Sequence, residues 1–124
     1  MKRKTLHLTI VGTLFLAALA AMFLVSHWKL RSDRAGCLIN MRNMHQTIYS
    51  VGGMKGVGAG QPYPGGPREL LKGLGEYTTL PRCPSGGTYS FGSDTTYSMI
   101  LNETIRCSHA EDLNHRWPEN GSRD

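Results

Sequence analysis

The hydrophobic positions of this chain follow three patterns in succession. Residues 5–28 form an almost unbroken apolar run, residues 29–50 show helical spacing, and residues 88–107 contain short stretches that alternate between polar and apolar. A helical period followed by an alternating one predicts a helix followed by strands. The expected fold class is therefore α+β: a long N-terminal helix, transmembrane and then amphipathic, packed on a small antiparallel β-sheet.

The apolar run is "TLHLTIVGTLFLAALAAMFLVSHW", the 24 residues between Lys4 and Lys29, and it contains no Asp, Glu, Lys or Arg. As a helix it would be about 36 Å long, which is enough for a hydrocarbon core of roughly 30 Å. Trp28 stands at its end, where an interfacial aromatic residue belongs. We expect a transmembrane helix over residues 5–28, preceded by a basic N-terminus over residues 1–4.

A cleaved signal peptide is the alternative interpretation of this run. "KRK" precedes the run, and "ALA" at residues 18–20 resembles a cleavage site. Strongly apolar residues continue from Met22 to Val25, after that site, which favours a retained anchor. We therefore expect the span to stay in the mature chain.

An amphipathic continuation of the helix is expected over residues 29–50. Five apolar or thiol side chains recur there at spacings of 7, 4, 3 and 4 residues: Leu30, Cys37, Met41, Met44 and Ile48. These spacings place them on one helical face. That face is expected to pack against the domain that follows.

A small, loop-rich α+β domain is expected over residues 51–109, followed by a polar, poorly ordered tail over residues 110–124. Seven glycines and three prolines in residues 52–67 predict a loop. "PRELLKGLGEY", residues 67–77, predicts a short helix with proline at its start and glycine at its end. The first half of the domain therefore holds one short helix after a long loop.

Two strands are expected in the second half of this domain, at "TYSF" (88–91) and "TYSMILNETIRC" (96–107), joined by a turn at "GSDT" (92–95). Apolar or thiol side chains occupy alternate positions of the second stretch: Tyr97, Met99, Leu101, Ile105 and Cys107. This alternation is typical of a strand with one buried face. The two strands are expected to form a hairpin.

The charge of the chain, formally +5, is concentrated beside the apolar run. Six Lys/Arg and one acid precede Cys37, whereas eight Lys/Arg and eight Asp/Glu occur from Cys37 onward. A nucleic-acid-binding protein would carry its basic residues on the folded domain, so we expect no nucleic-acid partner. "GVGAG" follows no strand and lacks the GK[ST] ending of a phosphate loop, so nucleotide binding is not expected. No small-molecule substrate is evident from the sequence.

Three basic residues precede the span and three follow it, so the positive-inside comparison discriminates little between the two orientations. The short "MKRK" end mildly favours the expected arrangement, an inner-membrane protein with its domain on the extracytoplasmic side.

Four stretches of the chain are similar to a bacterial group of type IV pilin-like, or pseudopilin-like, proteins. They are "CLINMRNMHQTIYS", "RELLKGLGEY", "LPRCPSGGTYSFG" and a later Cys-Ser and His, and they lie within residues 37–109. The resemblance implies a pilin-like fold and a non-enzymatic role in protein assembly or secretion at the cell envelope. It also implies other envelope or secretion-machinery proteins as partners.

The chain departs from that group at its N-terminus. Prepilins carry a Gly-Phe-Thr-Leu-Ile-Glu type processing site before the apolar run, and "KRKTLHLTIVG" contains neither this site nor a following glutamate. We therefore expect a pilin-like domain on an uncleaved anchor, which is not trimmed by a prepilin peptidase and is not a major filament subunit.

The three cysteines allow a disulfide bond or a metal site. Cys83 precedes a Gly-Gly turn and Cys107 ends the second strand, so the hairpin would bring them together. We expect a Cys83–Cys107 disulfide that closes 24 residues, with Cys37 as a buried thiol; such a bond contributes roughly 3 kcal/mol in the chain-entropy model. The alternative is a membrane-anchored metal-binding or redox-responsive domain with Cys37, Cys83, Cys107 and His109 as ligands.

Catalysis by these residues is not expected. Cys107 and His109 would face the same side of a strand, but no recognisable motif supplies an orienting carboxylate or an oxyanion site. We expect no catalytic residues, no enzyme activity and no cofactor.

Overall fold

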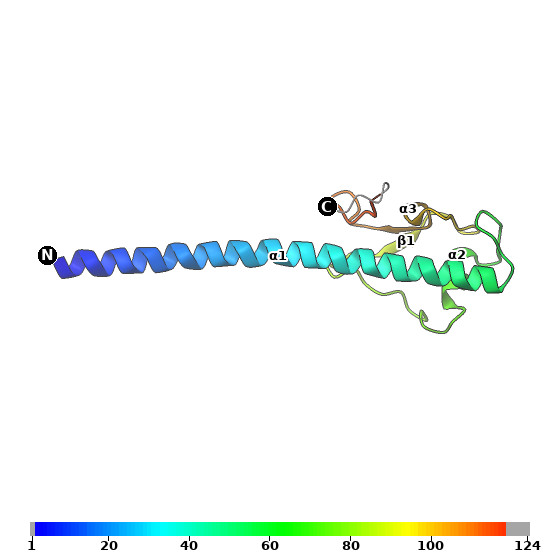
Figure 1. Cartoon of the computed structure of the whole chain (residues 1–124), viewed down its shortest axis with the longest axis horizontal. Coiled ribbons are helices and arrows are strands. Elements are labelled where there is room, and N and C mark those ends of the chain that lie inside the picture. Colours follow the sequence, from blue (N-terminus) through cyan, green and yellow to red (C-terminus); the bar gives the residue numbers. More distant parts are fainter. Residues whose placement is uncertain (1, 119–124) are drawn as a thin grey trace. The chain divides into compact units, whose positions relative to one another are not determined.

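The computed structural model describes residues 2–118, with side chains from residue 7 onward. Two compact units divide the chain, Met1–Ser32 and Asp33–Asp124. Five elements follow in chain order (Figure 1): α1 (Lys2–Met54), α2 (Gly66–Lys72), β1 (Tyr89–Phe91), α3 (Leu101–Thr104) and β2 (Ile105–Cys107). The expected α+β class, with a long N-terminal helix and a small antiparallel sheet, is confirmed.

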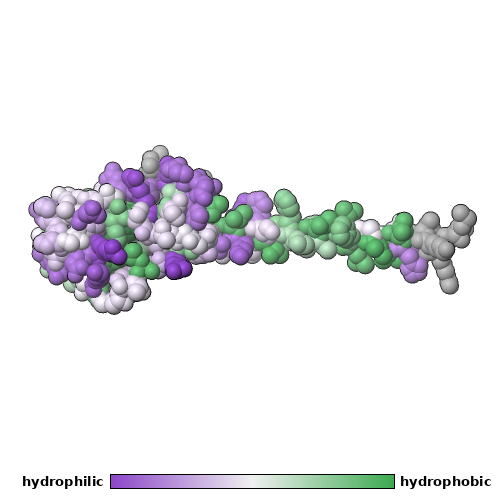
Figure 2. Space-filling model, turned by 180° about the vertical axis from the view of Figure 1, so that it is seen from behind, coloured by the Kyte–Doolittle hydropathy of each residue, from purple (hydrophilic) through white to green (hydrophobic). Residues whose placement is uncertain are grey.

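The first unit consists of the apolar part of α1. Among the described residues, α1 is the one helix that is long and apolar enough to cross a membrane. No part of its most apolar 18-residue stretch is buried in the protein. Figure 2 shows this stretch covered with hydrophobic side chains. Its hydroxyls bond within the helix, Thr13 to the Ile10 oxygen at 2.9 Å and Ser26 to the Met22 oxygen at 2.8 Å. The stretch therefore carries few polar groups that need water.

The second part of α1 supplies one wall of the domain core. The expected face is confirmed, because its members are 2% exposed or less, and Val51 extends it by one turn: Cys37, Met41, Met44, Ile48 and Val51. Leu30 is 53% exposed and lies in the first unit, so its assignment to this face was wrong. The helix ends at Met54, four residues beyond the expected residue 50.

The glycine-rich loop after α1 is fixed by hydrogen bonds to residues 95–97. The Gly60 N–H donates to the Tyr97 oxygen at 2.8 Å, and the Tyr63 N–H donates to the Thr95 oxygen at 2.9 Å. α2 then buries Leu70 and Leu71. It ends at Lys72 and not at residue 77, since turns containing two glycines occupy residues 73–77.

The sheet is a single antiparallel pair, in which Tyr89 is opposite Cys107 and Phe91 is opposite Ile105. The expected strand over residues 96–107 was wrong for all but its last three residues. Residues 101–104 form α3 because the Thr104 hydroxyl accepts from the Ser98 N–H at 2.9 Å, which folds the segment back on itself. The turn expected at residues 92–95 is therefore part of a longer connection, residues 92–104.

The segment after β2 belongs to the domain. Two hydrogen bonds join Asn102 to Trp117. The Asn102 side-chain NH₂ donates to the Trp117 backbone oxygen at 2.7 Å, and the Trp117 backbone N–H donates to the Asn102 side-chain oxygen at 3.0 Å. His115 is only 1% exposed. The expectation of a poorly ordered tail was thus wrong for residues 110–118, and residues 119–124 lie outside the described residues.

Candidate metal centre

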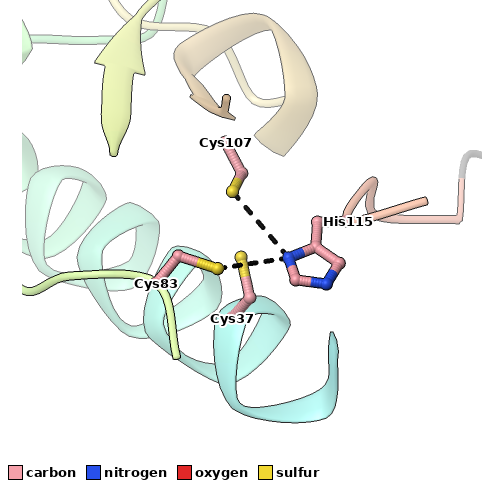
Figure 3. A group of neighbouring side chains, drawn as sticks. All are labelled: Cys37, Cys83, Cys107 and His115. Carbon is pink, nitrogen blue, oxygen red and sulfur yellow. Dashed lines mark hydrogen bonds between the residues drawn. The ribbon is translucent and has the colours of Figure 1, made fainter. Parts of the chain in front are cut away.

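Three segments bring the cysteines together in the core (Figure 3). Cys37 comes from α1, Cys83 from the loop before β1 and Cys107 from the last position of β2, and all three are at most 4% exposed. All three are free thiols, so the expected Cys83–Cys107 disulfide is not formed in this structure. The sequence predicted a bond between two cysteines, whereas the fold brings three sulfur atoms and one nitrogen atom together in one group.

The position of Cys83 is set by a tight turn over residues 83–87. The Gly86 N–H donates to the Cys83 oxygen at 2.8 Å, and the Cys83 N–H donates to the Gly87 oxygen at 3.0 Å. Gly86 has a φ of 86°, a conformation that other residues rarely adopt. The turn therefore explains the glycine at residue 86 and fixes the backbone of Cys83.

The helix and this turn approach closely because α1 has a glycine at residue 36. A Cβ atom at Gly36 would lie 3.0 Å from Cγ of Pro84, closer than an ordinary van der Waals contact. Gly36 and Pro84 are the chain neighbours of Cys37 and Cys83. The close approach thus brings these two cysteines together.

His115 completes the group through a turn of the segment after β2. Its backbone N–H donates to the His109 oxygen at 3.0 Å. Its ring atom Nδ1 lies 3.2 Å from Sγ of Cys83 and 3.9 Å from Sγ of Cys107. The four potential ligand atoms, from Cys37, Cys83, Cys107 and His115, all lie within 4.8 Å of one another.

His109, the histidine expected in the alternative metal site, is not a member of this group. Its Nδ1 lies 2.9 Å from an Asp112 carboxylate oxygen, and its side chain is 26% exposed. The ring contacts that of His115 edge-on, with 5.9 Å between the ring centres. The choice of His109 was therefore wrong, because the sequence spacing from Cys107 did not reveal the turn that carries His115 inward.

Burial favours the neutral form of most groups around the centre. It raises the pKa of Cys37 and of Cys107, and it lowers the pKa of His115. Burial also raises the pKa of Tyr89, and the neighbouring Cys37 thiol acts in the same direction. A cation among the four atoms would reverse this preference for the thiols, since it stabilises thiolates.

The arrangement has two chemical capacities. Three thiolates and one imidazole form a recognised tetrahedral ligand set, and two of the thiols could instead be oxidised to a disulfide. Comparison with protein-family models, with curated proteins and with solved structures found no match to this chain. The assignment of the centre therefore depends on its own geometry.

Proposed function

We propose that this is a non-enzymatic, single-pass membrane protein of the pilin-like kind, which takes part in protein assembly or secretion at the cell envelope. The observation that carries the proposal is α1 itself. One helix of 53 residues exposes apolar side chains in its first part and supplies a wall of the domain core in its second part. This is the use of a long N-terminal helix that the pilin-like resemblance implies.

The apolar part of α1 supports a membrane anchor. Three of its large side chains, Leu14, Phe15 and Phe23, are each more than 60% exposed, which is unfavourable in water and favourable in lipid. The basic N-terminus favours an inner-membrane protein with its domain on the extracytoplasmic side. The first part of α1 would thus hold the domain at the membrane surface.

The described side chains support an assembly role more than catalysis. The three thiols are at most 4% exposed, which leaves little of their surface for a substrate to contact. The domain surface instead offers large apolar side chains at Met99 and Ile100, which are 69% and 54% exposed. Surfaces of this kind are suited to contacts with other proteins.

Photo-crosslinking in intact cells tests this function. A photoreactive residue at Met99 of the full chain is expected to capture components of a secretion or pilus machine, identified by mass spectrometry. The matched control carries the same probe and an unrelated apolar span in place of residues 5–28, and it should give the same partners. Capture of cytoplasmic enzymes alone, or failure to capture any envelope protein, would contradict the proposal.

A further inference from the structure

We propose that Cys37, Cys83, Cys107 and His115 bind one Zn²⁺ ion in a closed, structural site. This inference goes beyond the proposed function and does not depend on it. It is carried by the convergence of four buried ligand atoms from four segments, all within 4.8 Å of one another. Such convergence of thiols and an imidazole is typical of a structural zinc centre.

The distances fit a tetrahedral ion. With Zn–S near 2.3 Å and Zn–N near 2.0–2.1 Å, a tetrahedral site separates sulfur from nitrogen by about 3.6 Å. The two observed Sγ–Nδ1 distances, 3.2 Å for Cys83 and 3.9 Å for Cys107, lie on either side of that value. These two distances need little adjustment. The other ligand atoms lie within 4.8 Å of one another, so they would have to approach by at most about 1 Å to bind one ion.

The ligand types and their spacing select the metal. Thiolates favour soft or borderline cations such as Zn²⁺, and they disfavour Mg²⁺ and Ca²⁺, which prefer oxygen. Ligand atoms this close leave no room for the bridging sulfides of an iron–sulfur cluster. Four protein ligands also leave no open coordination position, which is typical of structural and not of catalytic zinc.

Hydrogen-bond donors already surround two of the sulfur atoms. The His109 backbone N–H lies 3.5 Å from Sγ of Cys107. The Tyr89 hydroxyl is close enough to Cys37 to influence its thiol, and the Asn40 amide donates to the Tyr89 hydroxyl at 3.3 Å. Donors of this kind stabilise and orient metal-bound thiolates.

A cleft gives an ion access to the centre. It has a volume of about 530 Å³, and Cys107 and His115 both contribute to its wall. Two acidic and two basic residues also line it: Glu103, Glu111, Arg106 and Arg116. On binding, each thiol proton passes to the solvent, and His115 coordinates through Nδ1 while Nε2 keeps its proton. No electron transfer is required.

Zinc would tie together segments that are far apart in the chain. The ligands are separated by 46, 24 and 8 residues, and they join α1, the turn at residues 83–87, β2 and the segment that follows β2. A domain with so small a core gains much of its stability from such a link. The ion would provide the stabilisation that a disulfide provides in other small domains.

Metal analysis of the full chain, purified in detergent without a tag or chelator, tests the proposal. We expect one zinc ion per chain and three reduced cysteines, counted by alkylation in denaturant with chelator and without reductant. Absence of bound metal would overturn the proposal. A chain with Cys83 and Cys107 oxidised and Cys37 reduced would overturn it in favour of the disulfide.

Cobalt titration of variants identifies the ligands. The wild-type protein should give the intense visible bands of tetrahedral, thiolate-bound Co²⁺. A weak octahedral spectrum of the wild-type protein would overturn the proposal, and this test does not depend on whether the variants fold. Cys83→Ser and Cys107→Ser should lose these bands, and His115→Ala should bind Co²⁺ at least about tenfold more weakly. His27→Ala is the matched control, because His27 lies in the apolar part of α1 and is not one of the four ligands, so this variant should bind Co²⁺ normally. Equal losses in both histidine variants would contradict the assignment of His115.

Discussion

At the scale of single residues, the Tyr89 hydroxyl connects α1 to the sheet beside the thiol group. The side chain is 7% exposed, its hydroxyl is close enough to Cys37 to influence the thiol, and it accepts a hydrogen bond from Asn40 at 3.3 Å. A tyrosine in this position orients a ligand without coordinating the ion. Its effect on the centre can therefore be separated from that of the ligands themselves.

Tyr89→Phe removes this hydroxyl and leaves the ring. Loss of a polar group that orients a metal ligand typically lowers metal affinity by about 10–100-fold, and we expect a decrease in that range. Competition with a coloured chelator measures the affinity, and the sulfur-to-cobalt charge-transfer band should shift. Tyr49→Phe, at a residue 48% exposed, is the control. Unchanged affinity and spectrum in Tyr89→Phe would show that the hydroxyl does not act on Cys37.

Gly66 illustrates a second constraint on a single residue. Its φ is 60°, and a Cβ atom there would overlap the backbone oxygen of Asp94. Gly56 has a similar φ of 70° but no atom within 4 Å of such a Cβ.

The two glycines predict different results for the same substitution. Gly56→Ala should lower the free energy of unfolding by about 1–2 kcal/mol, the cost of a left-handed backbone for alanine. Gly66→Ala should lower it by at least about 2 kcal/mol more, because the loop must move away from Asp94. Urea unfolding of the full chain in detergent measures both, and equal losses would contradict the close packing of the loop.

At the scale of elements, local periodicity was a good guide to α1 and a poor one to α3. The positions of Cys37, Met41 and Met44 follow from the helical period, which depends only on backbone geometry. The alternation over residues 96–107 suggested a strand, but Thr104 bonds back to Ser98 and turns the segment into a helix. Side-chain to backbone bonds of this kind compete with sheet formation, and alternation does not reveal them.

The candidate site was predicted only in part, because the sequence pattern does not reveal tertiary contacts. The three cysteines were recognised from residue type, and the sequence placed Cys83 and Cys107 near each other. His115 was missed, because it is brought inward by tertiary contacts of a polar segment, including those between Trp117 and Asn102. A tryptophan in that segment is the sequence signal that could have indicated burial.

The Thr104 hydroxyl predicts a measurable contribution to α3. It accepts from the Ser98 N–H and donates to the Ser98 oxygen, both at 2.9 Å, and Thr104 is 1% exposed. Thr104→Val keeps the shape but leaves that N–H without this partner, so the free energy of unfolding should fall by about 1–3 kcal/mol. Exposed Thr78→Val should change it by less than about 0.5 kcal/mol. Similar values for the two variants in urea unfolding would contradict this account of α3.

At the scale of the whole molecule, the N-terminal unit makes two predictions. The apolar part of α1 should remain in the mature chain, so the protein should stay in the membrane fraction after carbonate extraction. Its exposed apolar side chains provide the reason, since none of the most apolar window is covered by protein. N-terminal sequencing checks the result. A mature chain that begins after Ala20 or Ala21 would show that the segment is a signal peptide.

The N-terminus makes a further prediction about filaments. Because "KRKTLHLTIVG" contains no prepilin processing site, co-expression with a prepilin peptidase should leave the mass of the chain unchanged. Intact-mass spectrometry measures this directly. Recovery of a trimmed, methylated chain from sheared filaments would contradict it.

The order of the four clustered residues along the chain has a consequence for biosynthesis. Cys37 is the first of them and His115 the last, so a nascent chain shorter than 115 residues lacks part of the set. The apolar segment leaves the ribosome well before that point. Domains fold as units once their chain is complete enough. The final packing around Cys37 is therefore expected late, after the apolar part of α1 has already left the ribosome.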